Sequence, residues 1–181
     1  MRPDRKPRRK GPAPLPEEQL RFLTGCIGEL MRQAPLEWMD RFPQHGDTSC
    51  LRHSLAVAYT AYRLSRRLCP GCDARSLVRG ALLHDFFLYD WHEKGGGHRL
   101  HGFTHPGTAL RNARRFLTLS RVEQEIIRRH MWPLTLVPPR CREAWLVCLA
   151  DKLCSLRETA RMRPRVPQAV LAALPGTCRG K

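Results

Sequence analysis

Apolar residues recur at three- and four-residue spacing in segment after segment of this 181-residue chain. Leu20, Leu23, Ile27 and Leu30 give the first example. This spacing places apolar side chains on one face of an α-helix, whereas a half-buried strand shows strict alternation. No segment alternates strongly, and no strong hairpin signal interrupts the series. The sequence therefore predicts an all-α fold, a compact bundle of about six to seven helices.

Capping residues and prolines mark the ends of the predicted helices. We expect helices over about 17–34, 48–68, 73–83, 105–117, 120–130 and 140–162, and a weak seventh over 166–174. Pro106 suits the first turn of the fourth helix, where a missing N–H costs nothing. Ser120 and Glu123 form a capping box that opens the fifth. Residues 86–104 show no sustained period and contain three consecutive glycines, so we expect a loop of functional length.

Positive charge is concentrated at the N-terminus. The chain has 32 Lys and Arg against 16 Asp and Glu, a formal net charge of +16. Residues 1–16 are rich in both arginine and proline, so we expect a disordered basic arm there, a single helical domain over 17–175 and a flexible tail over 176–181. Such a surface attracts phosphorylated small molecules, nucleic acid or acidic lipid.

Targeting and membrane segments are not expected. No apolar stretch of signal-peptide length follows the basic start, and the longest apolar run, Ala144–Ala150, is far shorter than the roughly 20 residues of a membrane span. We therefore expect a cytoplasmic protein with no membrane partner. Its eight cysteines should then be reduced thiols. Cys69 and Cys72 flank Pro-Gly, which predicts a turn, with a metal or redox site as the alternative.

Two aspartates stand at positions that a helix should bury. His84-Asp85 follows the apolar run 81–83, and Asp151 follows the apolar run 144–150. Burying an unpaired carboxylate costs several kcal/mol, so each aspartate needs a cation. Because His84 is adjacent to Asp85, a metal ion is a better candidate than an arginine.

Three further histidines, His53, His105 and His130, fall on other predicted helices. Each alone is more often a core or surface residue without a function. Four histidines and two aspartates from five helices together indicate a metal site, and only a packed bundle could bring them together. Imidazole and carboxylate ligands suit divalent Fe, Mn, Ni, Zn or Mg, and the few thiolates argue against a structural tetrathiolate zinc site.

This ordered series resembles the HD-domain superfamily of metal-dependent phosphohydrolases. The motifs are Leu-Arg-His53-Ser-Leu, Ala-Leu-Leu-His84-Asp85, Phe-Thr-His105-Pro, Arg-Arg-His130-Met-Trp-Pro and Leu-Ala-Asp151-Lys-Leu, within about residues 48–158. The sequence around these motifs is similar to that of small bacterial single-domain HD proteins. The resemblance implies a compact HD-type helical bundle over residues 17–175.

The resemblance also implies ligands for two divalent metal ions. One ion would be held by His53, His84, Asp85 and Asp151. Asp85 would bridge it to a second ion, held also by His105 and His130. The chain looks more like the two-metal branch, which includes symmetrical diadenosine tetraphosphate hydrolases. It lacks the long additional segment of the cyclic dinucleotide phosphodiesterases, so that activity is not expected.

The expected activity is hydrolysis of a phosphomonoester or phosphodiester, such as a nucleotide, by a metal-activated water. Asp85 would hold the metal pair together. The leaving oxygen needs a proton or a positive charge. Lys152, next to a candidate ligand, is the leading candidate to supply it, and Lys94, His98 and His101 are further candidates. The competing hypothesis is a nucleic-acid-associating or nucleotide-sensing protein with a structural metal site. Weak non-specific nucleic-acid binding through residues 1–16 would then fall steeply with salt.

Overall fold

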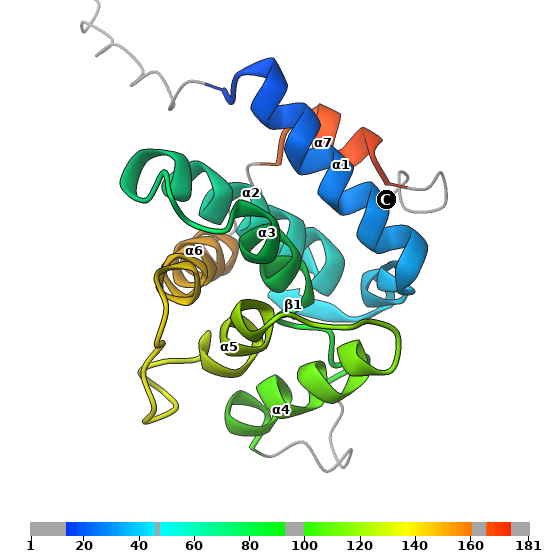
Figure 1. Ribbon diagram of the computed structural model, residues 1–181. Helices are drawn as coiled ribbons and strands as arrows, with labels where there is room; N and C mark the ends of the chain where they lie inside the picture. Colours follow the sequence, from blue (N-terminus) through cyan, green and yellow to red (C-terminus); the bar gives the residue numbers. More distant parts are fainter. Residues whose placement is uncertain (1–13, 46–47, 93–99, 161–165, 175–181) are drawn as a thin grey trace, which may run out of the picture.

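The computed structural model describes residues 14–45, 48–92, 100–160 and 166–174 (Figure 1). Within these ranges the chain forms seven α-helices, one 3₁₀ helix over Leu36–Arg41 and a two-stranded antiparallel sheet, so the predicted all-α fold is confirmed. The helices are α1 (Glu17–Gln33), α2 (Cys50–Leu68), α3 (Ala74–Leu83), α4 (His101–Arg114), α5 (Arg121–Arg129), α6 (Arg142–Thr159) and α7 (Gln168–Ala172).

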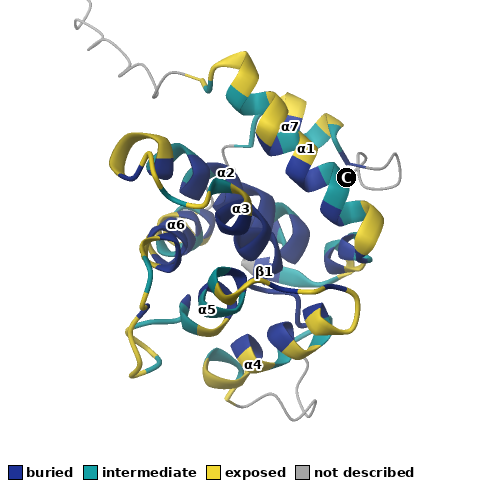
Figure 2. Ribbon diagram, viewed as in Figure 1, coloured by how far each residue is buried: buried dark blue, intermediate teal, exposed yellow. Residues whose placement is uncertain are grey.

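Helices α2 and α3 form the centre of the bundle, where Figure 2 shows mostly buried residues. Leu51 and Leu55 of α2 and Leu77 and Leu82 of α3 are fully buried between the surrounding helices. α2 packs on α3 and α6, and α3 packs on α5 and α1. Because α3 is buried along most of its length, the residues that follow Leu83 emerge inside the protein.

The predicted helix caps form as expected. Asp73 Oδ1 accepts a hydrogen bond from the Ser76 N–H at 3.0 Å at the start of α3. At the start of α5, Ser120 and Glu123 each accept a hydrogen bond from the other's backbone N–H, which completes the capping box. These caps fix where α3 and α5 begin, and therefore which residues stand at their ends.

The predicted start of the fourth helix was wrong. α4 begins at His101, and Pro106 lies inside it. The N–H groups of Phe103 and Thr104 bond to the Leu100 carbonyl and start the helix one turn earlier. Proline removes a single backbone donor, the one that would serve the Gly102 carbonyl, so the helix continues through Pro106.

Two other features were not predicted. Strands β1 (Pro43–His45) and β2 (Thr48–Ser49) pair antiparallel, but strands of three and two residues are too short to show a period. Cys69 and Cys72 form a disulfide, so the expectation of reduced thiols was wrong for this pair. The Pro-Gly turn brings their Cα atoms to 5.5 Å, the usual separation in a disulfide.

No helix in the described part of the chain is long and apolar enough to cross a membrane. Residues 1–13 of the predicted arm and the predicted tail over 176–181 lie outside the described ranges. The described helices all fall within the span 17–172.

Candidate metal centre

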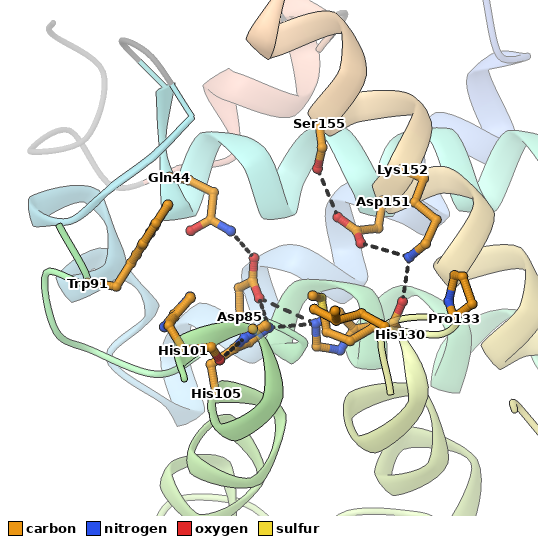
Figure 3. A pocket seen from close by; sticks show the side chains of 13 residues that line it. Gln44, Asp85, Trp91, His101, His105, His130, Pro133, Asp151, Lys152 and Ser155 are labelled. Atoms are coloured by element: carbon orange, nitrogen blue, oxygen red, sulfur yellow. Dashed lines mark hydrogen bonds and ion pairs between the residues drawn. The ribbon is translucent and has the colours of Figure 1, made fainter. Parts of the chain in front are cut away.

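Four imidazoles and two carboxylates meet at one buried place in the bundle. All are at most 7% exposed, and they belong to His53, His84, Asp85, His105, His130 and Asp151. The structure thus brings together every ligand that the sequence suggested. Figure 3 shows Asp85, His105, His130 and Asp151 converging on the floor of a pocket.

Five helices position these side chains. His53 lies in the first turn of α2, His105 lies within α4 and Asp151 lies in the middle of α6. His84 and His130 are the C-caps of α3 and α5. The apolar faces that pack α3 and α6 into the core also carry Asp85 and Asp151 inward, which explains the charged residues after apolar runs.

Backbone carbonyls orient three of the imidazoles. The Nδ1 atoms of His84, His105 and His130 lie 2.7, 2.9 and 2.9 Å from carbonyl oxygens three or four residues earlier in the chain. An Nδ1–H that donates to a carbonyl leaves Nε2 with its lone pair, the form that binds metals. Each ring therefore presents Nε2 to the other residues of the cluster.

A buried glutamate orients the fourth imidazole. Glu158 Oε2 lies 2.8 Å from His53 Nδ1, and Glu158 is 3% exposed. The sequence-based prediction missed this residue. The available signal was its position seven residues after Asp151, which puts both carboxylates on one face of α6. A carboxylate behind a ligating histidine is a common support in metal sites.

The two oxygens of Asp85 face different pairs of imidazoles. Oδ2 lies 3.2 Å from His84 Nε2 and 3.8 Å from His53 Nε2. Oδ1 lies 3.2 Å from His105 Nε2 and 3.6 Å from His130 Nε2. Asp85 therefore stands between two groups of donor atoms and belongs to both.

Asp151 completes the first group. Its Oδ1 lies 3.1 Å from His53 Nε2 and 3.8 Å from His84 Nε2. The ligand atoms of His53, His84 and Asp151 lie within 4.8 Å of one another, and so do those of His84, Asp85 and His130. Each of these two sets of three residues, which share His84, is compact enough to hold one metal ion.

Several polar atoms of the cluster are not satisfied by the protein. His84 Nε2 and Asp85 Oδ1 are buried and have no hydrogen-bond partner among the described residues. His105 Nε2 and His130 Nε2 face each other at 2.8 Å, although both rings have carbonyls beside Nδ1. Buried lone pairs of this kind are costly unless a cation binds them, so the donor set fits a divalent metal.

Burial and neighbouring charges shift the pKa values of several groups in the cluster. Burial and the nearby His84 lower the pKa of His130 to about 3, so this imidazole is neutral and able to bind a metal. Burial would raise the pKa of Asp85, but His84 and His105 outweigh it and hold that pKa well below its ordinary value. Burial would likewise lower the pKa of His53, but Asp151 and Glu158 raise it well above its ordinary value.

The cluster opens into a cavity of about 780 Å³ (Figure 3). Lys152 lies on its wall and donates a hydrogen bond from Nζ to the His130 carbonyl at 2.8 Å, with Asp151 Oδ2 3.7 Å away. Gln44, on β1, donates from Nε2 to Asp85 Oδ2 at 2.6 Å. No motif marked Gln44 in the sequence, because its position depends on a strand too short to predict.

Most of the remaining wall of the cavity is aromatic and apolar. Trp91 stacks nearly parallel on His101, with ring centroids 5.0 Å apart, and Met131, Pro133 and Leu134 line the same space. The sequence suggests His101 as a further candidate to supply a proton or a positive charge to the leaving oxygen. The structure places His101 at the pocket. Lys94 and His98, suggested for the same role, fall outside the described residues.

The family model of the HD domain matches residues 50–156, which is more than half of the chain and includes all six clustered residues. No curated protein and no solved structure matches the chain.

Proposed function

The chain belongs to the HD-domain family, and we propose that it is a phosphohydrolase that uses two divalent metal ions to cleave a small phosphoester. The family consists in general of metal-dependent hydrolases. The observation that carries the proposal is the position of Asp85, whose two oxygens face separate groups of ligand atoms. A carboxylate that stands between two such groups can bridge a pair of metal ions of the kind that acts on a phosphoryl group.

In this proposal one ion binds between His53, His84, Asp85 and Asp151, and the other between Asp85, His105 and His130. Divalent ions bound there would lower the pKa of water and neutralise the oxygens of a phosphoryl group. The protein supplies the rest: it holds four imidazoles with Nε2 inward, and its two buried carboxylates offset part of the charge of the cations. Because the six residues are buried on the protein side, water and substrate would reach the ions from the cavity.

Lys152 is the residue that we assign to the leaving group. The hydrogen bond to the His130 carbonyl holds its ammonium beside the cluster, on the cavity wall. An ammonium at this point can donate a hydrogen bond or a proton to an oxygen that becomes negatively charged. The carboxylate of Asp151 lies 3.7 Å from the same ammonium and also attracts it.

The cavity suits a small phosphorylated molecule. Its volume lies within the usual range for small-molecule sites, roughly 300–1,000 Å³. Lys152 and the proposed ions would bind the phosphoryl group, and Trp91, Met131 and Leu134 would contact the organic part, such as the base of a nucleotide. The net charge of +16 draws anionic substrates toward the protein.

A hydrolysis assay tests this proposal. The purified chain is loaded with Mn, Fe, Ni, Zn or Mg and is assayed against nucleotides, other phosphomonoesters and phosphodiesters. We expect metal-dependent release of phosphate or of a phosphomonoester, and we expect Asp85→Asn to abolish it. Lys152→Met should keep the metal but lower kcat about a hundredfold or more, as loss of a proton donor does.

Asp73→Asn is the matched control, because Asn caps a helix as well as Asp does and Asp73 lies at the exposed start of α3. This variant should keep full activity. Full activity of Asp85→Asn, or no hydrolysis of any phosphoester by the metal-loaded protein, would contradict the proposal.

A further inference from the structure

Helix α6 is apolar on two opposite faces. The face toward the bundle buries Ala144, Val147, Ala150 and Cys154. On the outer face, Trp145, Leu149, Leu153 and Leu156 are 42%, 45%, 42% and 70% exposed. The outer face of a helix in a bundle is normally polar, and a helix that is apolar all round is normally covered on all sides. The outer face of α6 therefore lacks a covering element among the described residues.

We call Trp145, Leu149, Leu153 and Leu156 the α6 ridge. Their spacing of four, four and three residues places them in one row along the helix. In Figure 1, α6 lies at the edge of the bundle, and Figure 2 shows exposed residues on it. Trp132 extends the ridge, because its ring contacts Trp145 edge to face at 4.9 Å between centroids.

We propose that the α6 ridge is the contact surface of a homodimer, in which the ridges of two copies pack antiparallel about a twofold axis. A straight row of similar apolar side chains is complementary to itself, as a twofold contact requires. This proposal is independent of the proposed hydrolytic activity, since the ridge residues do not line the cavity.

Basic residues stand at both ends of α6. An antiparallel pair places the amino end of one α6 beside the carboxyl end of the other. Exposed Arg142 at the amino end would then lie near the negative end of the other copy's helix dipole, but also near Arg157 in the last turn of that helix, so these two charges repel each other at low salt. The four ridge residues themselves carry no charge.

The exposed apolar area is of the size that a dimer needs. The connection before α6 adds two exposed apolar side chains, Leu136 and Val137, which are 92% and 39% exposed. Together these side chains expose several hundred Å², on the scale of one side of a standard interface, which is about 800 Å². Apolar patches this large on a monomer commonly mark contact sites.

The net charge of each copy gives the dimer a recognisable response to salt. Two chains of +16 repel each other at long range, while burial of the ridges attracts them. Salt screens the repulsion and leaves the apolar attraction in place. Dimerisation should therefore become stronger as ionic strength rises, which is opposite to the behaviour of a contact with an acidic partner.

Sedimentation equilibrium of the full chain tests the inference over ionic strengths from about 0.05 to 1 M. We expect a monomer–dimer equilibrium whose Kd falls as salt increases. Leu149→Glu should raise that Kd at least about a hundredfold, because a twofold contact buries the new carboxylate twice. Leu68→Glu, at a 66% exposed leucine that ends α2, is the matched control and should leave Kd unchanged.

Circular dichroism and thermal unfolding show whether Leu149→Glu keeps the helical fold. If it does not, Leu156→Glu takes its place, because Leu156 is the most exposed residue of the ridge. A chain that is monomeric at every salt concentration overturns the inference. A folded ridge variant that still dimerises overturns it, and so does a dimer that weakens as salt rises.

Discussion

At the scale of single residues, the direction of each imidazole determines what the cluster can bind. Backbone carbonyls set the rings of His84, His105 and His130, so these rings follow from the helix geometry itself. His53 differs, because the carboxylate of Glu158 lies beside its Nδ1. Glu158 is therefore a positioning residue that a substitution can remove without touching a ligand.

We predict that Glu158→Leu weakens metal binding at the group that contains His53 about 10- to 100-fold. Leucine fills the buried space but removes the carboxylate that accepts from His53 Nδ1. Glu158→Gln should lose less, because the amide oxygen still accepts a hydrogen bond from Nδ1. Competition with a chelator of known affinity measures the change, with the exposed neighbour Thr159→Ala as control. Unchanged affinity in Glu158→Leu would show that Glu158 does not position His53.

The sequence identified the candidate ligands better than the residues that support them. Asp85 and Asp151 could be found because a charge after an apolar run is anomalous. Glu158 follows Leu156 and Arg157 and is typical of a solvated helix end. Its spacing from Asp151 indicates a shared face of α6, but its burial depends on the packing of α6 on α2. Gln44 is placed by β1, which pairs with β2 only a few residues later, but strands of three and two residues are too short to give a periodic signal.

At the scale of elements, close packing of α3 on α5 sets the place where His84 and Asp85 emerge. Gly80 of α3 faces Ile126 of α5, and no room is left between them for a side chain on Gly80. A Cβ added at Gly80 would lie 2.7 Å from Ile126 Cδ1 and 3.0 Å from Ile126 Cβ. The terminal methyl group could rotate away, but Cβ is fixed to the backbone, so the helices themselves would have to separate.

We predict that Gly80→Ala destabilises the protein by about 1–2 kcal/mol. Alanine gains about 0.5–1 kcal/mol of helix propensity, but overpacking of a tight contact costs about 1–3 kcal/mol. Gly25→Ala in α1 is the matched control. No neighbouring atom lies within 4 Å of its added Cβ, so this variant should show only the stability gained from the helix propensity of alanine. Urea unfolding measures both changes. Equal stabilisation by the two variants would contradict the packing argument.

The sequence predicted the helix starts correctly where residues within the same turn determine them. The Ser120–Glu123 capping box and the Asp73 cap lie within one turn of the residues they serve, and both formed. The start of α4 was misplaced because proline is typical of a helix start, although it removes only one hydrogen bond inside an established helix. The Cys69–Cys72 disulfide was not predicted, because the expected cytoplasmic compartment disfavours disulfides whatever the geometry of the turn.

At the scale of the whole molecule, the cluster joins five helices at one point. Its ligands come from α2, α4 and α6 and from the ends of α3 and α5, so they assemble only in the folded chain. An ion that binds the folded state alone must stabilise it. In the proposed function, metal binding at this cluster is therefore coupled to the stability of the entire bundle.

We predict that chelation lowers the unfolding temperature. At a free metal concentration of 100 Kd, binding at one site stabilises the folded state by about 2.7 kcal/mol, which corresponds to roughly 5–10 °C for a domain of this size. Differential scanning calorimetry with added metal and with added chelator measures the difference. Asp85→Asn should show the same unfolding temperature in both conditions, and an equal shift in this variant would place the bound metal elsewhere.

If Asp85 joins two metal ions, the number of ions bound per chain shows it most directly. Metal analysis of the purified, reconstituted protein should give two ions per chain. His105→Ala should keep one ion, in the group formed by His53, His84, Asp85 and Asp151, and Asp85→Asn should lose both. One ion or none in the unaltered chain, or two ions retained by Asp85→Asn, would contradict a metal pair bridged by Asp85.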